Sequence, residues 1–559
     1  MKNNFYNFLY LLIAGVILFT SCTKKLEEYN PSGLTPSSVY TTAAGFNTLV
    51  NAAYTFNRYW YGKEEGFAYS EMGTDLWTSG TGDVCPQFTQ YINLQGSNVD
   101  GGTGTTTWTS LWGDLYASVN LCNQGITAIS KVTDLSAARK ANLEGELRFL
   151  RAFYYWHIVE TWGGVHFTTQ PNVGTTTIAN RTPVDTFYNQ IFTDLQFAVN
   201  NLPVTTTDYG RATLPVAKAF LARMYLTRGM NVQAAAMAND VIKNYGYVLM
   251  PNYGDLWNMG NLKNREVIWA VDYSTNLTLN DATYFSNAAG VPQRGSNNAH
   301  LLFVMLYDKA NTKPLIRDIN GGRPFNRFMP TLAYLNMFDA PNDARYAGSF
   351  QDVWYANQVA TGYAIGDTAV YCPKIAIPTA SLSKKYVTYD LSKVYNTTTG
   401  AVVQRSYYPT LRKFKDSTRA SIAEVQSARD VFVIRLSEMY LIAAEAEFNT
   451  GKSDSAAYYL NVIRTRASIP GHTAAMQIVP AQVNLDFILD ERARELGGEQ
   501  LRWFDLKRTG KLMDRIKTKN MNPDAALNIQ TFHSVRPIPQ SQLDAVTNKS
   551  VFTQNPGYN

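Results

Sequence analysis

Apolar residues recur at helical spacing in the segment 430–508, around which the C-terminal part of the chain is organised. In the first helix predicted there, positions i, i+3, i+4, i+7 and i+10 share one face and are Leu436, Met439, Tyr440, Ala443 and Ala446. Ile434, Leu441 and Phe448 form a second apolar stripe, so we expect this helix to be buried between two neighbours. Gly451 can end the helix in the left-handed conformation, and a second amphipathic helix follows it.

Two helices joined by a tight turn within about 34 residues have the size of a tetratricopeptide repeat unit. A single hairpin of this kind cannot bury both of its faces, so similar hairpins are expected to stack beside it. The same periodicity predicts helices in the N-terminal half at 37–58, 108–130, 136–161, 185–201, 215–229 and 232–244. The predicted fold class is therefore mainly α, an α-superhelix of tetratricopeptide-like hairpins.

Other stretches lack this periodicity. Residues 71–107 are rich in Gly, Thr and Asn and predict a long exposed loop, which is often a functional feature. The segment 266–273 is more strand-like than helical. Residues 275–429 combine Gly, Pro and short aromatic runs, and so long a segment is not expected to be structureless in a compact protein. We interpret it as an irregular, partly helical lobe on the helical scaffold, and residues 536–559 as an extended surface tail.

The composition favours a neutral ligand. Apolar residues make up 45% of the 559 residues, which indicates a globular chain with a real core. Charged residues are only 17%, whereas Thr, Asn and Tyr are plentiful, so the surface is expected to be neutral and rich in hydrogen-bonding groups. The net charge of +6 is small for this length, and no basic run with interleaved aromatic residues is present. These features argue against a nucleic-acid partner.

The N-terminus is typical of an exported lipoprotein. Lys2 precedes a short apolar stretch at 8–19, which is too short to span a bilayer. The small residues before Cys22 are similar to a bacterial lipobox, so residues 1–21 are predicted to be a signal peptide and Cys22 to carry the lipid. Residues 22–36 then form a polar tether. The alternative interpretation is an ordinary secretory signal in which the cysteine is incidental. No later stretch of the sequence is apolar enough to span a membrane.

Motifs that suggest catalysis or metal binding have simpler structural interpretations. TGKS at 450–453 follows a helix rather than a strand, and Ala446 stands where a P-loop needs glycine, so we interpret it as a helix–helix turn. The acidic and basic residues of 491–505 are expected to form ion pairs between helices, with Trp503 and Phe504 as buried anchors. No HExxH, CxxC or GxSxG motif is present, and no metal or other cofactor is predicted. A disulfide between Cys85 and Cys122 remains open.

Four blocks along the chain together resemble the SusD/RagB family. They are GELRFLRAFYYWHIVETWGGVHF at 145–167, RLSEMYLIAAEAEFNTGK at 435–452, LDERARELGGEQLRWFDLKRTG at 489–510 and RPIPQSQLDAVTNKSVFTQNPGYN at 536–559. The blocks occur in the order of the family, and the resemblance thins between 275 and 429. It implies a SusD-like domain over 37–559, with an N-terminal part at 37–245, an irregular lobe at 275–429 and a C-terminal RagB/SusD part at 430–559.

The resemblance also implies a function. Members of this family are surface lipoproteins of the outer membrane that bind a nutrient, usually a glycan or oligosaccharide. They deliver it to a TonB-dependent transporter of the SusC type, without catalysis. For this chain the resemblance implies a lipid anchor at Cys22, a position outside the cell and a SusC-like partner.

Location and side-chain type indicate candidate ligand-binding residues. Sugar recognition needs flat aromatic faces for C–H groups and planar polar groups for hydroxyls. Loop 71–107 and the central lobe offer both, in Asp75, Trp77, Gln87, Tyr91, Tyr284, Arg294 and Trp354. The alternative is that Trp77 and Trp354 are core residues, because tryptophan is highly buried on average.

Two other functions remain open. A surface glycan-degrading enzyme would need two carboxylates facing one cleft, and the sequence offers no convincing pair on loops. A helical-repeat assembly scaffold would need no ligand at all, and binding measured on the isolated protein distinguishes it from a capture protein.

Overall fold

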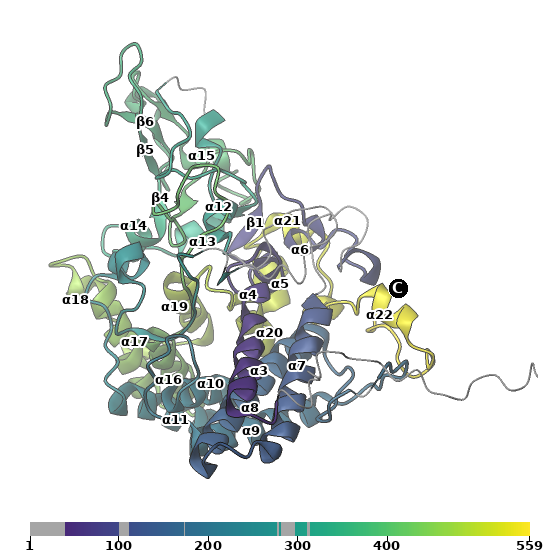
Figure 1. Ribbon diagram of the computed structural model, residues 1–559. Coiled ribbons are helices and arrows are strands. Elements are labelled where there is room, and N and C mark those ends of the chain that lie inside the picture. Colours follow the sequence, from purple (N-terminus) through teal and green to yellow (C-terminus); the bar gives the residue numbers. More distant parts are fainter. Residues whose placement is uncertain are drawn as a thin grey trace, which may run out of the picture.

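The computed structural model describes residues 40–99, 111–172, 174–276, 279–280, 297–309 and 314–558. A scaffold of long helices carries a smaller lobe of short strands and helices at one end (Figure 1). The fold is mainly α, as the periodicity predicts, and no helix in these described ranges is long and apolar enough to cross a membrane.

Seven helices of the scaffold pack in a continuous series, each against the next. In the order of packing they are α7 (Leu111–Ala128), α8 (Ala137–Trp162), α9 (Val184–Asn201), α10 (Leu214–Thr227), α11 (Asn231–Asn244), α16 (Leu436–Asn449) and α17 (Ser453–Ala467). The helices predicted in these regions are confirmed. The contact between α11 and α16 joins segments far apart in sequence, so the lobe is an insertion between neighbouring helices.

Two paired strands close the base of this insertion. β2 (Val267–Val271) pairs with β9 (Val431–Arg435) in antiparallel register, from Val267 opposite Arg435 to Val271 opposite Val431. The strand predicted at 266–273 is confirmed. The prediction that Ile434 belongs to a stripe of the following helix is wrong, because Ile434 lies in β9 and α16 begins at Leu436. Ile434 is β-branched and fully buried between neighbouring elements, an environment that also suits a strand.

The lobe contains short strands and helices. In the part of the lobe that the structure describes, the α-helices are α12 (Ala299–Leu302), α13 (Leu332–Asn336), α14 (Arg345–Ser349) and α15 (Leu391–Val394). Its strands are β3 (Phe328–Pro330), β4 (Phe350–Gln351), β5 (Val353–Tyr355), β6 (Thr368–Tyr371), β7 (Val387–Thr388) and β8 (Thr410–Leu411). β4 pairs with β8 in a two-stranded sheet, whereas β5, β6 and β7 form a three-stranded sheet. β3 pairs outside the lobe with β1 (Trp77–Ser79).

The N-terminal helices α3 (Ala43–Thr55), α4 (Asn57–Trp60), α5 (Glu64–Ser70) and α6 (Pro86–Thr89) lead from the scaffold to the lobe. The C-terminal part adds α18 (Thr473–Met476), α19 (Leu485–Leu496), α20 (Arg502–Arg508), α21 (Pro523–Ala526) and α22 (Gln540–Ala545). The predicted surface tail therefore includes a short helix. It is also held in place, since Arg536 N donates to Thr161 O at 2.7 Å and Thr547 N to Thr177 O at 2.8 Å.

The three cysteines that the structure describes, Cys85, Cys122 and Cys372, are buried free thiols. A disulfide between Cys85 and Cys122, which the sequence leaves open, is not formed. Burial raises the pKa of the Cys122 thiol, so this side chain behaves as a small apolar residue of the core.

Candidate ligand-binding site

Asp75 is a buried ion-pair partner. Its carboxylate accepts hydrogen bonds from Arg502 Nε at 2.8 Å and from Arg515 Nε at 2.5 Å. Burial by itself would raise the pKa of Asp75, but the two guanidinium groups lower it to about 2. The side chain has an exposed fraction of 0%. In this structure Asp75 therefore joins the N-terminal segment to the C-terminal helices and offers no surface to a ligand.

Trp77 is likewise a core residue in this structure, with an exposed fraction of 0%. It begins β1 opposite Pro330 of β3, and its Nε1 donates to Glu71 Oε2 at 3.0 Å. Its ring packs edge-on against Phe303 and Tyr334, with centroids 4.8 and 5.3 Å away. This environment is the alternative that the sequence left open, and it makes Trp77 a support for the loop rather than a platform.

The other described candidates are also buried. Gln87 Nε2 donates to Asn98 O at 3.1 Å, and Tyr91 donates its hydroxyl to Gly73 O at 3.1 Å. Trp354 stacks on Tyr307 with ring centroids 4.4 Å apart. Tyr284 and Arg294, as well as Cys22, lie outside the described residues.

The structure nevertheless brings the predicted loop and the lobe together. Gly80 N donates to Arg327 O at 2.8 Å, and Thr81 N donates to the Oδ1 atom of Asn326 at 2.6 Å. Thr81 Oγ1 lies 3.1 Å from Ser406 Oγ, and Arg405 donates to Ser79 O at 2.7 Å. These bonds extend the β1–β3 pairing beyond Ser79, so exposed groups from both segments share one edge of the lobe.

Partly exposed aromatic side chains lie at this edge, next to exposed polar ones. We call this surface the loop junction and define it by the residues Thr81, Arg323, Phe325, Tyr389 and Tyr407. The guanidinium group of Arg323 lies 5.2 Å from the centre of the Phe325 ring. Tyr389 stacks on Tyr407 with centroids 4.2 Å apart. Asn326 Nδ2, next to Phe325, donates at 3.3 Å to the carbonyl of Ser406, next to Tyr407. Sequence reasoning missed these residues, although GGRPFNRF at 321–328 does place an aromatic residue between two arginines.

A separate open groove of about 590 Å³ runs between the segment after α11 and the lobe. Its walls are Gly254, Asp255, Trp257, Asn258, Met259, Asn320, Ala344, Ala347, Gly348, Arg412, Lys415 and Ser417. The buried Nε1 of Trp257 has no hydrogen-bond acceptor among the described residues. Burial lowers the pKa of Lys415 to about 7, and its Nζ lies 4.5 Å from the centre of the Trp354 ring.

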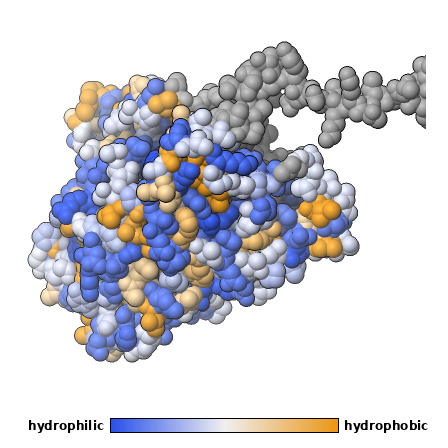
Figure 2. All heavy atoms as spheres, turned by 60° about the horizontal axis from the view of Figure 1, so that its bottom comes forward, coloured by the Kyte–Doolittle hydropathy of each residue, from blue (hydrophilic) through white to orange (hydrophobic). Residues whose placement is uncertain are grey.

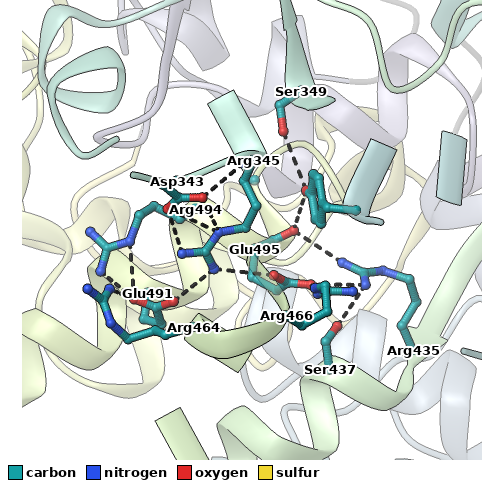
Figure 3. Close-up of polar contacts among 12 residues, drawn as sticks. Asp343, Arg345, Ser349, Arg435, Ser437, Arg464, Arg466, Glu491, Arg494 and Glu495 are labelled. Atoms are coloured by element: carbon teal, nitrogen blue, oxygen red, sulfur yellow. Dashed lines mark hydrogen bonds and ion pairs between the residues drawn. The ribbon is translucent and has the colours of Figure 1, made fainter. Parts of the chain in front are cut away.

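Glu491 and Glu495 of α19 are bound in a buried ion-pair network (Figure 3). Glu491 pairs with Arg345 of α14 at 2.8 Å, with Arg464 of α17 at 2.8 Å and with Arg494 at 2.5 Å. These three cations lower the pKa of Glu491 against the opposing effect of burial. The predicted ion pairs between helices are confirmed, and the network also ties the lobe to the helices.

The same organisation extends along α19 and α20. Arg435 pairs with Glu495 at 3.2 Å and with Glu499 at 2.7 Å, and Arg492 pairs with Asp505 at 2.8 Å. Trp503 and Phe504 are buried, so their predicted role as anchors is confirmed. Because these carboxylates are buried and bound to arginines, they do not face a cleft as a glycosidase pair must.

Comparison with known proteins identifies the family. The model of the SusD family matches residues 265–558, and a second model, described as "Starch-binding associating with outer membrane", matches residues 73–226. This chain belongs to the SusD family. The prediction made from the four sequence blocks is therefore confirmed.

Several relatives cover nearly the whole chain. SusD-like protein P25 of Formosa agariphila is 24% identical over 538 residues, which is 94% of each chain. The starch-binding protein SusD of Bacteroides thetaiotaomicron is 25% identical over 471 residues, covering 76% of this chain and 74% of that protein. Among solved structures, a laminarin-binding SusD-like protein superposes with a TM-score of 0.68 at 23% identity, covering 93% of this chain and all of its own.

Proposed function

We propose that this SusD family member captures a glycan at the outer surface of the outer membrane and delivers it to a SusC-like TonB-dependent transporter. The observation that carries the proposal is the match to the family along both halves of the chain. Two relatives support glycan as the ligand class, since one is named for binding starch and the other for binding laminarin. The low proportion of charged residues, 17%, is in keeping with a neutral ligand.

The glycan is proposed to bind at the loop junction. Phe325, Tyr389 and Tyr407 present partly exposed rings that can pack against the C–H face of a sugar. Thr81 and Arg323 are exposed beside them and can bond to hydroxyl groups. The buried candidates Asp75, Trp77, Gln87 and Tyr91 would then act indirectly, by holding the loop in position.

Phe325→Ala tests this site. Soluble starch, laminarin and a wider glycan panel are titrated against the full mature chain by calorimetry. For the glycan that binds, the variant is expected to weaken affinity about tenfold or more, as loss of an aromatic anchor does at interfaces. Tyr458→Ala is the matched control, because Tyr458 is exposed on α17, away from the lobe. Unchanged affinity in Phe325→Ala excludes the loop junction, and absence of any glycan binding favours an assembly scaffold.

Binding is proposed to occur without turnover. The carboxylates of α19 are engaged in ion pairs, which supports a binding protein rather than a glycoside hydrolase. Incubation of the glycan with pure protein for hours should leave its chain length unchanged by chromatography. Hydrolysis that disappears when one carboxylate is replaced would instead establish the enzyme.

The membrane anchor is proposed to be Cys22, following a signal peptide at 1–21 and preceding the tether at 22–36. Several acyl chains hold a protein on a membrane stably, whereas one binds only marginally. Cys22→Ser should move the protein from the membrane fraction to the soluble fraction. Protease treatment of intact cells tests the outward position, since only a surface protein is digested.

The partner is proposed to be a SusC-like barrel that this protein covers as a lid. The series of helices offers a broad docking face, on which hydrophobic residues lie in separate small groups among polar ones (Figure 2). The lipid tether would raise the effective concentration of the lid at the barrel. Affinity purification from gently solubilised outer membranes should recover one large barrel protein. If the lipidated chain is recovered alone at its native expression level, the proposal that it covers a barrel as a lid is wrong.

A further inference from the structure

The open groove of about 590 Å³ beside α14 has walls built partly from very small residues. α14 lies where the lobe meets the helices (Figure 1). Gly254, Ala344, Ala347 and Gly348 each bring at most a methyl group, so they leave the groove open to solvent. Its volume falls within the range of small-molecule sites, roughly 300–1,000 Å³. The groove is therefore already formed and large enough for a small ligand.

Arg412 gives this groove an available cation. The residue follows β8, its side chain is exposed, and it forms no hydrogen bond or ion pair with any residue that the structure describes. Nearby basic residues differ, since Lys413 donates to Glu499 at 3.0 Å and Arg429 donates to a backbone carbonyl at 3.1 Å. A guanidinium group presents a planar fork of N–H donors that matches a carboxylate. Arg412 can therefore bind an oxyanion in the groove.

Lys415 places a second cation in the same groove. Its Nζ donates to Asn320 O at 3.4 Å and to the side-chain oxygen of Gln351, and it forms no ion pair within the described ranges. Burial and repulsion from Arg412 lower the pKa of Lys415 to about 7, although Asp318 opposes this effect. Because the two cations repel each other and neither has an anionic partner, an anion bound between them would stabilise both charges.

The neutral groups of the groove supply further donors. Asn258, Asn320 and Ser417 are exposed lining residues, and their side-chain N–H or O–H groups meet no acceptor in the part of the chain that the structure describes. Asp255 is the only carboxylate among the lining residues, and its Oδ2 already accepts from Asn252 Nδ2 at 3.1 Å. The lining thus has more cations than carboxylates and several unused donors, which favours an anionic ligand that also carries hydroxyl oxygens.

We propose that this groove binds an acidic sugar unit, whose carboxylate lies between Arg412 and Lys415 and whose hydroxyl oxygens accept from the neighbouring amide and hydroxyl groups. The inference takes carbohydrate as its ligand class from the proposed function, whereas the negative charge follows from the groove itself. It differs in location, because none of the loop-junction residues lines the groove. It extends the proposed ligand from a wholly neutral glycan to one that carries acidic units.

Saturation-transfer NMR on the full mature chain tests the groove, with D-glucuronate and D-galacturonate compared with D-glucose and D-galactose at pH 6. At least one uronate is expected to give a signal about fivefold or more above that of its neutral counterpart. Arg412→Gln, which changes an exposed side chain, should lower that signal about fivefold or more through loss of charge-assisted hydrogen bonds. Arg139→Gln makes the same change at an exposed arginine of α8 and is the matched control.

Lys415 provides a second readout. Because its pKa is about 7, the ammonium group loses its proton as the pH rises from 6 to 8.5. The affinity for the uronate should therefore decline over this interval in the unchanged protein. Lys415→Met should make the decline shallower, since the group that loses its charge is then absent. An identical decline in Lys415→Met would mean that Lys415 does not contact the carboxylate.

Several results would overturn the acidic-sugar site. They are no signal from either uronate, equal signals from the uronates and their neutral counterparts, or an undiminished uronate signal in Arg412→Gln. Displacement of the uronate by an equal concentration of sodium sulfate would assign the groove to a free oxyanion and reject the sugar. Polysaccharide titration separates these results from failure of the proposed function. If the chain binds a neutral glycan but no uronate, only the groove is wrong, whereas absence of all carbohydrate binding removes both proposals.

Discussion

Asp75 and Arg502 are 427 positions apart in sequence, yet two guanidinium nitrogens of Arg502 donate to the Asp75 carboxylate at 2.8 and 2.6 Å. The pair is buried and also includes Arg515. It joins the segment that enters the lobe to the helices that follow α19. A loop chosen from sequence as a ligand platform is therefore anchored by charge to the C-terminal part of the scaffold.

Replacement of Asp75 by Asn should destabilise the protein strongly. The change removes the negative charge that neutralises the buried guanidinium groups of Arg502 and Arg515. Breaking a buried ion pair in this way typically lowers the free energy of unfolding by about 3–5 kcal/mol. Chemical denaturation followed by fluorescence measures the loss. Asp185→Asn is the matched control, because its pair with Arg228 is exposed and should contribute less than about 1 kcal/mol. Equal stability of both variants would contradict the anchoring role of Asp75.

Acid should destabilise the protein through the same group. The pKa of Asp75 is lowered from 3.8 to about 2 in the folded chain, so the unfolded chain binds more protons between these values. The stabilising contribution is complete above pH 3.8 and is lost as pH falls toward 2. Denaturation at pH 5, 4, 3 and 2.5 should show a shallower decline in Asp75→Asn than in the unchanged protein. Parallel declines would mean that other carboxylates account for the acid sensitivity.

Trp77→Ala should act on stability first. The ring is fully buried, and truncation of a buried aromatic side chain costs about 3–5 kcal/mol through lost burial and the cavity left behind. The indole also donates to Glu71, which would lose a partner. Trp77→Phe keeps most of the packing and should recover part of the stability. If Trp77→Ala keeps full stability but loses glycan binding, the sequence-based interpretation of a direct platform is restored.

Lys415 predicts that stability also rises with pH in a second, alkaline interval. Burial lowers its pKa from 10.5 to about 7, so the unfolded chain binds more protons between pH 7 and 10.5. The contribution of Lys415 to the free energy of unfolding is therefore lowest below pH 7 and rises as the pH increases from 7 to 10.5. Lys415→Met should flatten the rise measured by urea denaturation at pH 7, 8 and 9. Lys452→Met serves as the control because Lys452 is exposed, and an identical flattening there would exclude a specific effect.

The sequence by itself determined the helical hairpins and the family. Leu436, Met439 and Ala443 recur at helical spacing, and this local periodicity is enough to predict α16, because helix geometry depends on nearby residues. Gly451, just after the end of α16, has a φ of +80° and so takes the expected left-handed conformation. The strand at 266–273 was also recognised from its local composition, but its partner was not.

The tertiary structure decided which residues are accessible. Trp77 and Trp354 have the residue type of a sugar platform, yet both are packed against other aromatic rings, whereas Phe325 and Tyr407 remain partly exposed. Exposure depends on contacts between distant segments, such as β1 with β3, which no local pattern encodes.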